Sequence, residues 1–263
     1  MTISCTTPRD RHGRCDWHSE RFVRVIDVAH ASHRDLLDLQ ISTLFLLDPE
    51  RRLLAINEPG TPRAPRFFLG RSTNGHRWRV RYDLPADVVH RLDQLYHAEP
   101  QRAPLAGPPE QAAAIRAVLA EDAPIVGEER GPAYWLPDVS FIPPQVILLS
   151  EAHAALVQNT FPWLVTWLAD AANGPVAAVI AQGNAVSVCF CSRITPHAAE
   201  AGIETLAAFR GKGAATAAAA GWAAAVQHSQ RVALYSTSWQ NHASQAVAKK
   251  LGARLYAEDW SIM

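Results

Sequence analysis

The sequence carries no excess of charge of either sign, since Lys and Arg total 25 and Asp and Glu also total 25. A neutral chain generates no overall positive field, and such a field is what draws proteins onto nucleic acids or anionic membranes without a specific site. We therefore expect neither a nucleic acid nor a membrane as a partner. Any anion that the protein binds must be held by local groups.

The C-terminal half also lacks a long apolar run. Its longest uncharged apolar stretch, 214–226, is far shorter than the roughly 20 residues that span a bilayer. The N-terminal stretch 1–22 is polar and charged and lacks the apolar segment of a secretory signal. We expect no transmembrane helix and a cytoplasmic location.

Cysteine is scarce, with four residues in the chain. Cys5 and Cys15 lie in the polar N-terminal tail, whereas Cys189 and Cys191 alternate within an apolar run and are expected on one face of a strand. This usage favours reduced thiols in a cytosolic protein. Cys15 and His18 have no second pair at ligand spacing, and the histidines form no H-E-x-x-H pattern, so we predict no metal site.

The first half of the chain predicts a small α+β unit after a flexible tail. Residues 1–20 are polar and expected to be flexible, and an α+β extension spans 21–125. Prolines and glycines gather between 100 and 144, which places the domain boundary there. The patterns within the extension predict strands at 53–57, 66–71 and 78–82 and helices at 30–45, after Pro85 and at 111–120.

Residues 130–263 show a more regular succession of helices and strands. Apolar runs between turn residues predict strands at 146–149, 200–206, 232–237 and 253–260, and a hairpin formed by 175–181 and 185–194. Helical spacing predicts helices at 151–159, 161–172, 213–228 and 241–251. We expect 130–263 to form the second domain.

The stretch 209-FRGKGAAT-216 joins a predicted strand to a predicted helix. The first N–H groups of a helix have no partner within the helix and, with the helix dipole, favour an anion. Gly211 and Gly213 allow the backbone to curl around a phosphate, and Arg210 and Lys212 add positive charge. The spacing fits neither the Walker A nor the G-x-G-x-x-G pattern, because no glycine stands at 216 or five residues before Gly211.

Two motifs resemble those of the GNAT N-acetyltransferase superfamily. The turn 210-RGKGAA-215 matches the [QR]-x-x-G-x-[GA] segment by which that family holds the pyrophosphate of acetyl-coenzyme A. After the helix and the strand 231-RVALYSTS-238 comes 241-NHASQAVAKKLGA-253, which is similar to the family's asparagine-headed helix ending in Leu-Gly. The resemblance covers about residues 130 to 263 and points to a bacterial subgroup with a long N-terminal extension. An alternative for 21–125 is a degenerate GNAT-like unit.

The resemblance implies a fold and a co-substrate. The fold class is α+β (mixed α/β), with a central mixed twisted sheet flanked by helices and with two parallel strands that splay apart. Acetyl-coenzyme A would lie in that opening. The residues that the resemblance assigns to it are Thr205, Leu206 and Ala207 for the arm, Arg210, Gly211, Lys212, Gly213, Ala214 and Ala215 for the pyrophosphate, and Asn241 and Ser244 on the following helix.

Acetyl transfer to an amine needs a base, oxyanion donors and an acid for the leaving thiolate. Glu200 and Glu204 stand four residues apart on one strand, so both should share a face and either is a candidate base, or both are solvent-facing carboxylates. Backbone N–H groups near 203–205 are candidate oxyanion donors. Where many family members carry a tyrosine as the acid, this sequence has Ala248. Substitutes are Ser236, Ser238, Tyr256 or solvent, and Trp239 is expected to border the cleft.

These features predict an acetyl-CoA-dependent N-acetyltransferase in which the acceptor amine attacks the thioester directly. The acceptor is expected to be a small molecule or a peptide. The extension is expected either to shape the acceptor pocket or to mediate homodimerisation. The alternative, which the missing tyrosine leaves open, is a non-catalytic GNAT-like module that binds an acyl-CoA and acts as a sensor or scaffold.

Overall fold

A computed structural model of the chain describes residues 31–100, 105, 107–139 and 142–263. The tail 1–20, with Cys5 and Cys15, lies outside these residues. Within them, no helix combines the length and the apolar character that crossing a bilayer requires.

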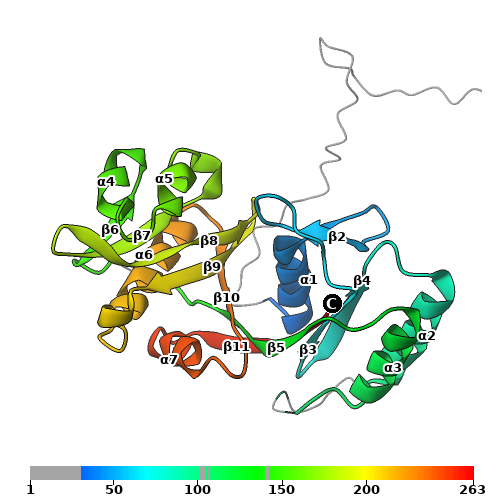
Figure 1. The fold of residues 1–263 in the computed structure, drawn as a ribbon. Coiled ribbons are helices and arrows are strands. Elements are labelled where there is room, and N and C mark those ends of the chain that lie inside the picture. The colour runs from blue at the N-terminus through cyan, green and yellow to red at the C-terminus, as the bar shows by residue number, and fades with distance from the viewer. Residues whose placement is uncertain (1–30, 101–104, 106, 140–141) are drawn as a thin grey trace, which may run out of the picture.

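The described elements divide into two runs along the chain (Figure 1). The first run consists of α1 (His33–Leu44), β1 (Phe45–Leu47), β2 (Leu53–Ile56), β3 (Phe67–Ser72), β4 (Gly75–Val80), α2 (Ala86–Ala98) and α3 (Ala112–Asp122). The second run consists of β5 (Glu128–Trp135), β6 (Val146–Leu149), α4 (Ala154–Val157), α5 (Trp163–Leu168), β7 (Val176–Ala181), β8 (Asn184–Ile194), β9 (Ala198–Thr205), α6 (Ala214–His228), β10 (Val232–Ser236), α7 (His242–Lys250) and β11 (Arg254–Ile262).

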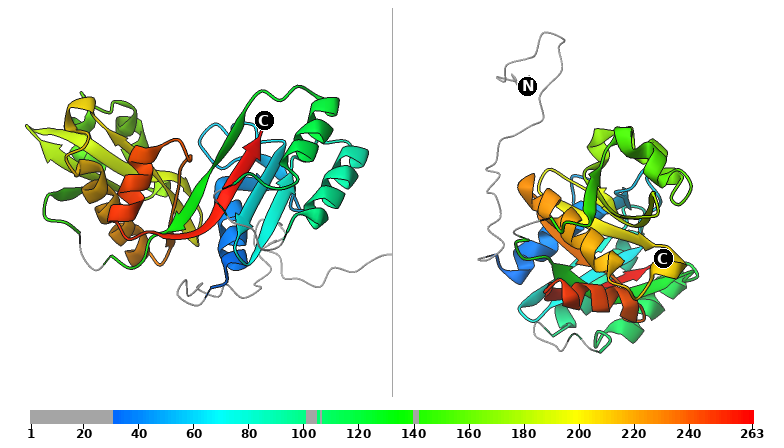
Figure 2. Two further views of the ribbon diagram at one scale, coloured as in Figure 1. Left: turned by 90° about the horizontal axis from the view of Figure 1, so that it is seen from below. Right: turned by 90° about the vertical axis from the view of Figure 1, so that its left-hand side faces the viewer.

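One nine-stranded sheet runs through both parts of the chain, in the order β4-β3-β11-β5-β10-β9-β8-β7-β6. Its neighbouring strands pair antiparallel except β9 and β10, which are parallel, so the sheet is mixed as predicted. Figure 2 shows β5 and β11 running side by side between the half of the molecule with α6 and α7 and the half with α2 and α3. β1 and β2 form a separate two-stranded ribbon.

Helices cover both faces of the sheet. On one face α1 packs Leu36 and Leu37 against Ala198, Leu234 and Tyr256, and α4 and α5 pack further along the same face. On the other face α6 packs Trp222 and small alanines against the strands, while α2 and α3 cover the end that carries β3. Helix α6 lies close to the sheet because the residues that face the sheet are small. A Cβ on Gly221 would stand 2.5 Å from a methyl group of Val146.

Local chemistry fixes where α1 begins. The Ser32 hydroxyl accepts from the Asp35 N–H at 3.2 Å, and the Asp35 carboxylate accepts from the Ser32 N–H at 3.1 Å, which together form a capping box. The helix therefore starts at His33, three residues later than the sequence predicted. The two helices predicted at 151–172 are shorter than expected, and each is joined to a 3₁₀ turn, at Glu151–His153 and Ala171–Asn173.

Strand β5 was not predicted, because Gly131 and Pro132 lie in its middle and proline removes a ladder donor. The strand holds because the chain that follows β10 supplies other donors: Thr237 N–H donates to the Pro132 carbonyl at 3.3 Å and Trp239 N–H to the Arg130 carbonyl at 3.2 Å. That chain passes so close that a Cβ on Gly131 would stand 1.7 Å from the Thr237 carbonyl oxygen. Gly131 is therefore required by the close approach of residues 237–239.

Candidate active site

The two parallel strands of the sheet separate part of the way along their length. β9 and β10 pair only from Ala198 with Val232 to Glu200 with Leu234. Beyond that point β9 continues to Thr205 beside β8, while β10 pairs with β5 on its other side. The splay that the resemblance implied is therefore present, and it exposes one edge of β9.

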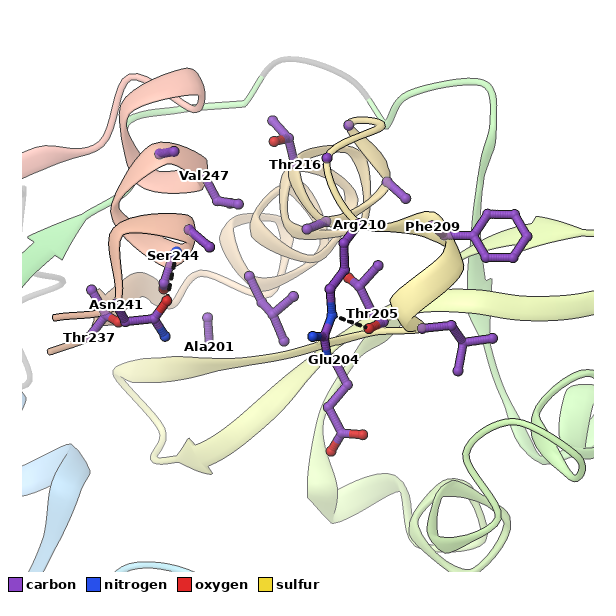
Figure 3. A pocket seen from close by; sticks show the side chains of 18 of the residues that line it. Ala201, Glu204, Thr205, Phe209, Arg210, Thr216, Thr237, Asn241, Ser244 and Val247 are labelled. Atoms are coloured by element: carbon purple, nitrogen blue, oxygen red, sulfur yellow. Dashed lines mark hydrogen bonds between the residues drawn. The ribbon is translucent and has the colours of Figure 1, made fainter.

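A cleft of about 910 Å³ opens at this splay, between β9, the turn before α6, and helix α7 (Figure 3). Of the residues predicted to hold the co-substrate, those that line the cleft are Thr205, Leu206, Ala207, Arg210, Gly211, Gly213, Ala214, Ala215, Asn241 and Ser244. Lys212 does not line it, and its ammonium group instead lies 5.5 Å from the centre of the Phe209 ring. The structure thus brings together residues separated by up to 39 positions in sequence, from Thr205 to Ser244.

The turn before α6 has the backbone that its two glycines predicted. Gly211 and Gly213 have φ angles of 73° and 86°, in the region that favours glycine, and open space surrounds the place where a Cβ would stand on either. Gly213 caps α6, and the first bond within the helix runs from Ala217 N–H to the Gly213 carbonyl. The N–H groups of the first helical turn therefore face the cleft without a helical partner, as an anion site requires.

Two cations contribute to this end of the cleft. Arg210 lines the cleft, and its Nε donates to the Thr205 carbonyl at 3.2 Å, which fixes the guanidinium beside the turn. Lys250, in the last turn of α7, lines the cleft from the opposite wall. Lys250 was not predicted, because only the fold places the end of α7 opposite the start of α6.

The free edge of β9 offers backbone groups to the cleft at alternate residues. Leu206 N–H donates to the Val186 carbonyl of β8, so this amide is not available to the co-substrate arm to which the resemblance assigned Leu206. Because backbone groups alternate along a strand, the amides of Ile203 and Thr205 face the opening. Ile203 and Thr205 also line the cleft.

The head of α7 is held by its own side chains. The Asn241 Oδ1 accepts from the Ser244 N–H at 3.0 Å, so Asn241 caps the helix. The Ser244 hydroxyl lies 2.6 Å from the Tyr235 hydroxyl, and both residues line the cleft. Burial raises the pKa of Tyr235 to about 12, so this phenol keeps its proton. Tyr235 was missed by the sequence analysis, since nothing in an apolar strand marks which tyrosine meets a serine.

The two candidate bases share a face of β9 but differ in environment. Glu204 is exposed, lines the cleft, and in Figure 3 its carboxylate points away from α6 and α7. Glu200 is 1% exposed, and its Oε1 accepts from the Ser236 hydroxyl at 2.6 Å. Burial raises the pKa of Glu200, an effect that the Ser236 bond and the charge of Arg193 partly offset. Ser236 itself lines the cleft, so Glu200 is connected to the cleft through one hydroxyl.

The candidate acids differ in whether they line the cleft. Ser236 lines the cleft, whereas Ser238 and Tyr256 do not. Tyr256 is 1% exposed on the face covered by α1, and Ala248 is fully buried. The prediction that Trp239 borders the cleft is wrong: its indole N–H donates to the Glu258 carboxylate at 2.6 Å instead.

Other reactive side chains are used in packing. Cys189 and Cys191 are free thiols buried on the α6 face, which confirms that they share a face. The Trp222 indole N–H lies 3.3 Å from the Cys191 sulfur, and burial raises the pKa of that thiol to about 11. Within the described parts of the chain, no group of His, Cys, Asp and Glu side chains is arranged to hold a metal ion.

Residues 115–254, more than half of the chain, match a family model described as an acetyltransferase (GNAT) domain. Among curated proteins the comparison finds no match. A solved structure of a GNAT-family protein from Novosphingobium aromaticivorans is 20% identical, with a TM-score of 0.42, over 53% of this chain and 66% of that one, which is just under two thirds.

Two further solved structures match over more of their length. A GCN5-related N-acetyltransferase-like protein from Streptococcus suis is 16% identical with a TM-score of 0.43, over 76% of this chain and 85% of that one. An acetyltransferase from the GNAT family of Colwellia psychrerythraea is 11% identical with a TM-score of 0.41, over 89% of this chain and 98% of that one.

Proposed function

Because the chain belongs to the GNAT acetyltransferase family, and is therefore an acyltransferase, we propose that it transfers an acetyl group from acetyl-coenzyme A to an amine. The observation that carries the proposal is the course of the cleft. It runs from the first turn of α6, along the open edge of β9, to the Ser236 hydroxyl that contacts the buried Glu200. The anion site and the extended edge thus lie in one continuous cleft, and the buried Glu200 is connected to it through the Ser236 hydroxyl.

The residues of the cleft fit the parts of the co-substrate. The N–H groups of Ala214, Ala215 and Thr216, together with Arg210, suit a diphosphate. The amides of Ile203 and Thr205 suit an extended arm that adds to β9 as a further strand. When bound, acetyl-coenzyme A supplies the activated thioester.

Glu200 and Ser236 are suited to remove a proton from the acceptor. The amine nitrogen forms the new C–N bond as the C–S bond breaks. One proton passes from the nitrogen to the Ser236 oxygen while the Ser236 proton passes to Glu200. A carboxyl whose pKa is raised by burial is a stronger base once ionised, which suits proton removal near neutral pH.

Tyr235 and Ser244 are suited to stabilise the leaving sulfur. The Tyr235 phenol keeps its proton because its pKa is raised to about 12, and its hydroxyl is 2.6 Å from that of Ser244. Both line the cleft on the α7 side, opposite β9. The pair therefore supplies hydroxyl groups that can donate hydrogen bonds to the leaving sulfur in place of the tyrosine that Ala248 replaces, and the sulfur takes its proton from solvent.

The second candidate is a non-catalytic module that binds an acyl-CoA. Ala248 favours it, because this buried alanine stands where many family members carry an acid. The Glu200 and Ser236 pair favours the enzyme, because burying a carboxyl beside the cleft costs stability that binding alone does not require.

Release of free thiol from acetyl-coenzyme A in the presence of primary amines separates the two. We expect Glu200→Gln to lower kcat by about 100-fold or more, the range typical of a lost general base. The affinity for coenzyme A, measured by calorimetry, should be unchanged, since Glu200 does not line the cleft. Glu151→Gln, an exposed matched control, should behave like the wild type. A protein that binds coenzyme A but releases no thiol with any amine would be the sensor.

A further inference from the structure

A second cavity, of about 290 Å³, lies on the opposite face of the sheet from α6 and α7. Its walls come from both parts of the chain. The apolar wall is formed by Leu44, Phe45, Ile56, Pro65, Phe68 and Met263. The remaining wall is polar and includes Ser236, Thr237 and Asp259.

The second cavity meets the donor cleft at one wall. Ser236 and Thr237 line both. The alternation of side chains along β10 explains this, because Tyr235 faces α7 while Ser236 lies on the α1 face with Glu200. A molecule in the second cavity thus reaches the opening between β9 and β10 from the side opposite to α6.

Several buried polar atoms without a hydrogen-bond partner lie on the same face of the sheet as this cavity, which Asp259 lines. Among the described residues they include Glu200 Oε2, Asp259 Oδ1, Gln40 Oε1 and the Tyr256 hydroxyl. The other Asp259 oxygen accepts from Gln40 Nε2 at 2.6 Å, which fixes the carboxyl under α1. Most of these free atoms are acceptors, so the missing group is a donor.

The cations nearest the cavity are already paired. Arg193 forms an ion pair with Glu58, although its Nε has no partner, and Arg130 Nε lies 3.1 Å from a Glu258 oxygen. Glu129 adds a further carboxylate at the exposed end of the wall. The charge of Arg193 acts on both the buried Glu200 and the half-buried Asp259, but among the described residues neither carboxyl forms a direct ion pair. This arrangement suits a ligand that brings one positive charge to Asp259.

The positions of the two carboxyls suggest how such a ligand would lie. Ser236, which contacts Glu200, stands opposite Ala133 of β5, and Asp259 stands opposite Gly131 of the same strand. Ser236 and Asp259 therefore lie on opposite sides of β5 and two residues apart along it. Their backbones are on the order of 10 Å apart. Apolar side chains line the space on the α1 face.

We propose that this cavity binds the acceptor and that the acceptor is a small aliphatic diamine. One amine lies at Ser236, where it is acetylated, and the second, as an ammonium group, is held by Asp259. The hydrocarbon chain between them packs on the apolar wall that the N-terminal part of the chain provides. This inference rests on the proposed function, and it gives the extension the role of building the acceptor site.

The test compares cadaverine with n-pentylamine, its monoamine counterpart, in the thiol-release assay. We expect kcat/KM for the diamine to exceed that for the monoamine by about tenfold or more, as expected for a hydrogen bond to a charged group. Asp259→Asn keeps the shape and a group that can accept from Gln40, and should reduce this ratio to about one.

A second variant tests whether the acceptor binds in this cavity, and it leaves the charged residues of the cavity unchanged. Ile56→Trp fills the apolar wall and should raise KM for the diamine while KM for acetyl-coenzyme A stays unchanged, because Ile56 lines only the second cavity. Equal rates with the diamine and the monoamine, or a ratio that Asp259→Asn leaves unchanged, would overturn the inference while the acetyltransferase proposal stands. If wild-type protein releases no thiol with any amine, the proposed function itself fails.

Discussion

At the scale of single residues, the central feature is a carboxyl that the fold buries beside a reactive cleft. Glu200 is 1% exposed and one of its oxygens has no partner, while the other is held by Ser236. Isolated buried carboxyls are costly and are found where function requires a shifted pKa. Its burial on the α1 face of the sheet is the cause of the shift.

The raised pKa of Glu200 predicts a pH dependence. Below that pKa the carboxyl is protonated and cannot take the proton from Ser236, so kcat/KM for acetyl transfer should rise as pH increases through the raised pKa, above the usual range of a glutamate. The measurement is kcat/KM against pH for the wild type and for Glu200→Gln.

In Glu200→Gln the rise of kcat/KM through the raised pKa of Glu200 should disappear from the pH profile. The part of the profile at higher pH, which reflects titration of the acceptor amine, should remain. An unchanged lower limb in Glu200→Gln would assign the titration to another group and remove Glu200 as the base.

At the scale of elements, the wall between the two cavities depends on how β5 and the chain after β10 pack. Gly131→Ala would place a Cβ 1.7 Å from the Thr237 carbonyl oxygen. We expect the variant to lose about 2 kcal/mol of stability, in the range of overpacked sites, and to lose acetyltransferase activity as residues 237–239 are displaced. Urea denaturation and the thiol-release assay measure these effects.

Gly107→Ala is the matched control, because nothing lies within 4 Å of a Cβ at that position. It should change the stability by less than about 0.5 kcal/mol. Equal stability of the two variants would show that the chain after β10 yields easily and does not depend on Gly131.

The elements with strong local signals were predictable from the sequence. The alanine-rich run with Gly213 before it predicted α6, Asn241 predicted the head of α7, and the Gln182-Gly183 turn predicted the β7–β8 hairpin. β5 was missed because Gly131 and Pro132 normally interrupt a strand. The donors to the Pro132 and Arg130 carbonyls, Thr237 and Trp239, lie over 100 residues away in sequence. Local sequence patterns do not indicate hydrogen-bond donors that are so distant in sequence.

The residues of the site were likewise predictable where they belong to a contiguous motif and not where distant elements bring them together. The turn 210–215 and the head of α7 are contiguous motifs, and all but Lys212 of the residues predicted to hold the co-substrate line the cleft. Tyr235, Lys250 and Asp259 were missed because their roles arise from contacts between distant elements. The buried state of Glu200 could not be foreseen either, since glutamate is usually exposed and its burial arises only when distant elements pack together.

At the scale of the whole molecule, the sheet joins the two parts of the chain. β11 pairs with β5 over its length and with β3 from Glu258 to Ile262. Trp260 is buried with Phe67, and Glu258 forms a buried ion pair with Arg71. The N-terminal part thus covers apolar and charged groups that belong to the C-terminal part.

A fragment that begins at residue 126 should therefore not fold as a stable unit. It loses α1, which covers Leu234 and Tyr256, and it leaves the Glu258 carboxylate without Arg71. Breaking a buried pair costs about 3–5 kcal/mol when the remaining charge is left uncompensated, and Arg130, 3.1 Å from Glu258, would offset part of that loss in the fragment. We expect aggregation or a broad, non-cooperative thermal transition by circular dichroism, compared with the full chain. A sharp transition with bound coenzyme A would instead show that 126–263 is an independent domain.

The most direct test of the central claim is a crystal structure of the full chain with coenzyme A bound. The diphosphate should accept hydrogen bonds from the N–H groups at the start of α6, within residues 210–216, and the arm should lie along the free edge of β9. A diphosphate bound anywhere else, or an arm outside the splay of β9 and β10, would contradict the assignment of this cleft as the donor site.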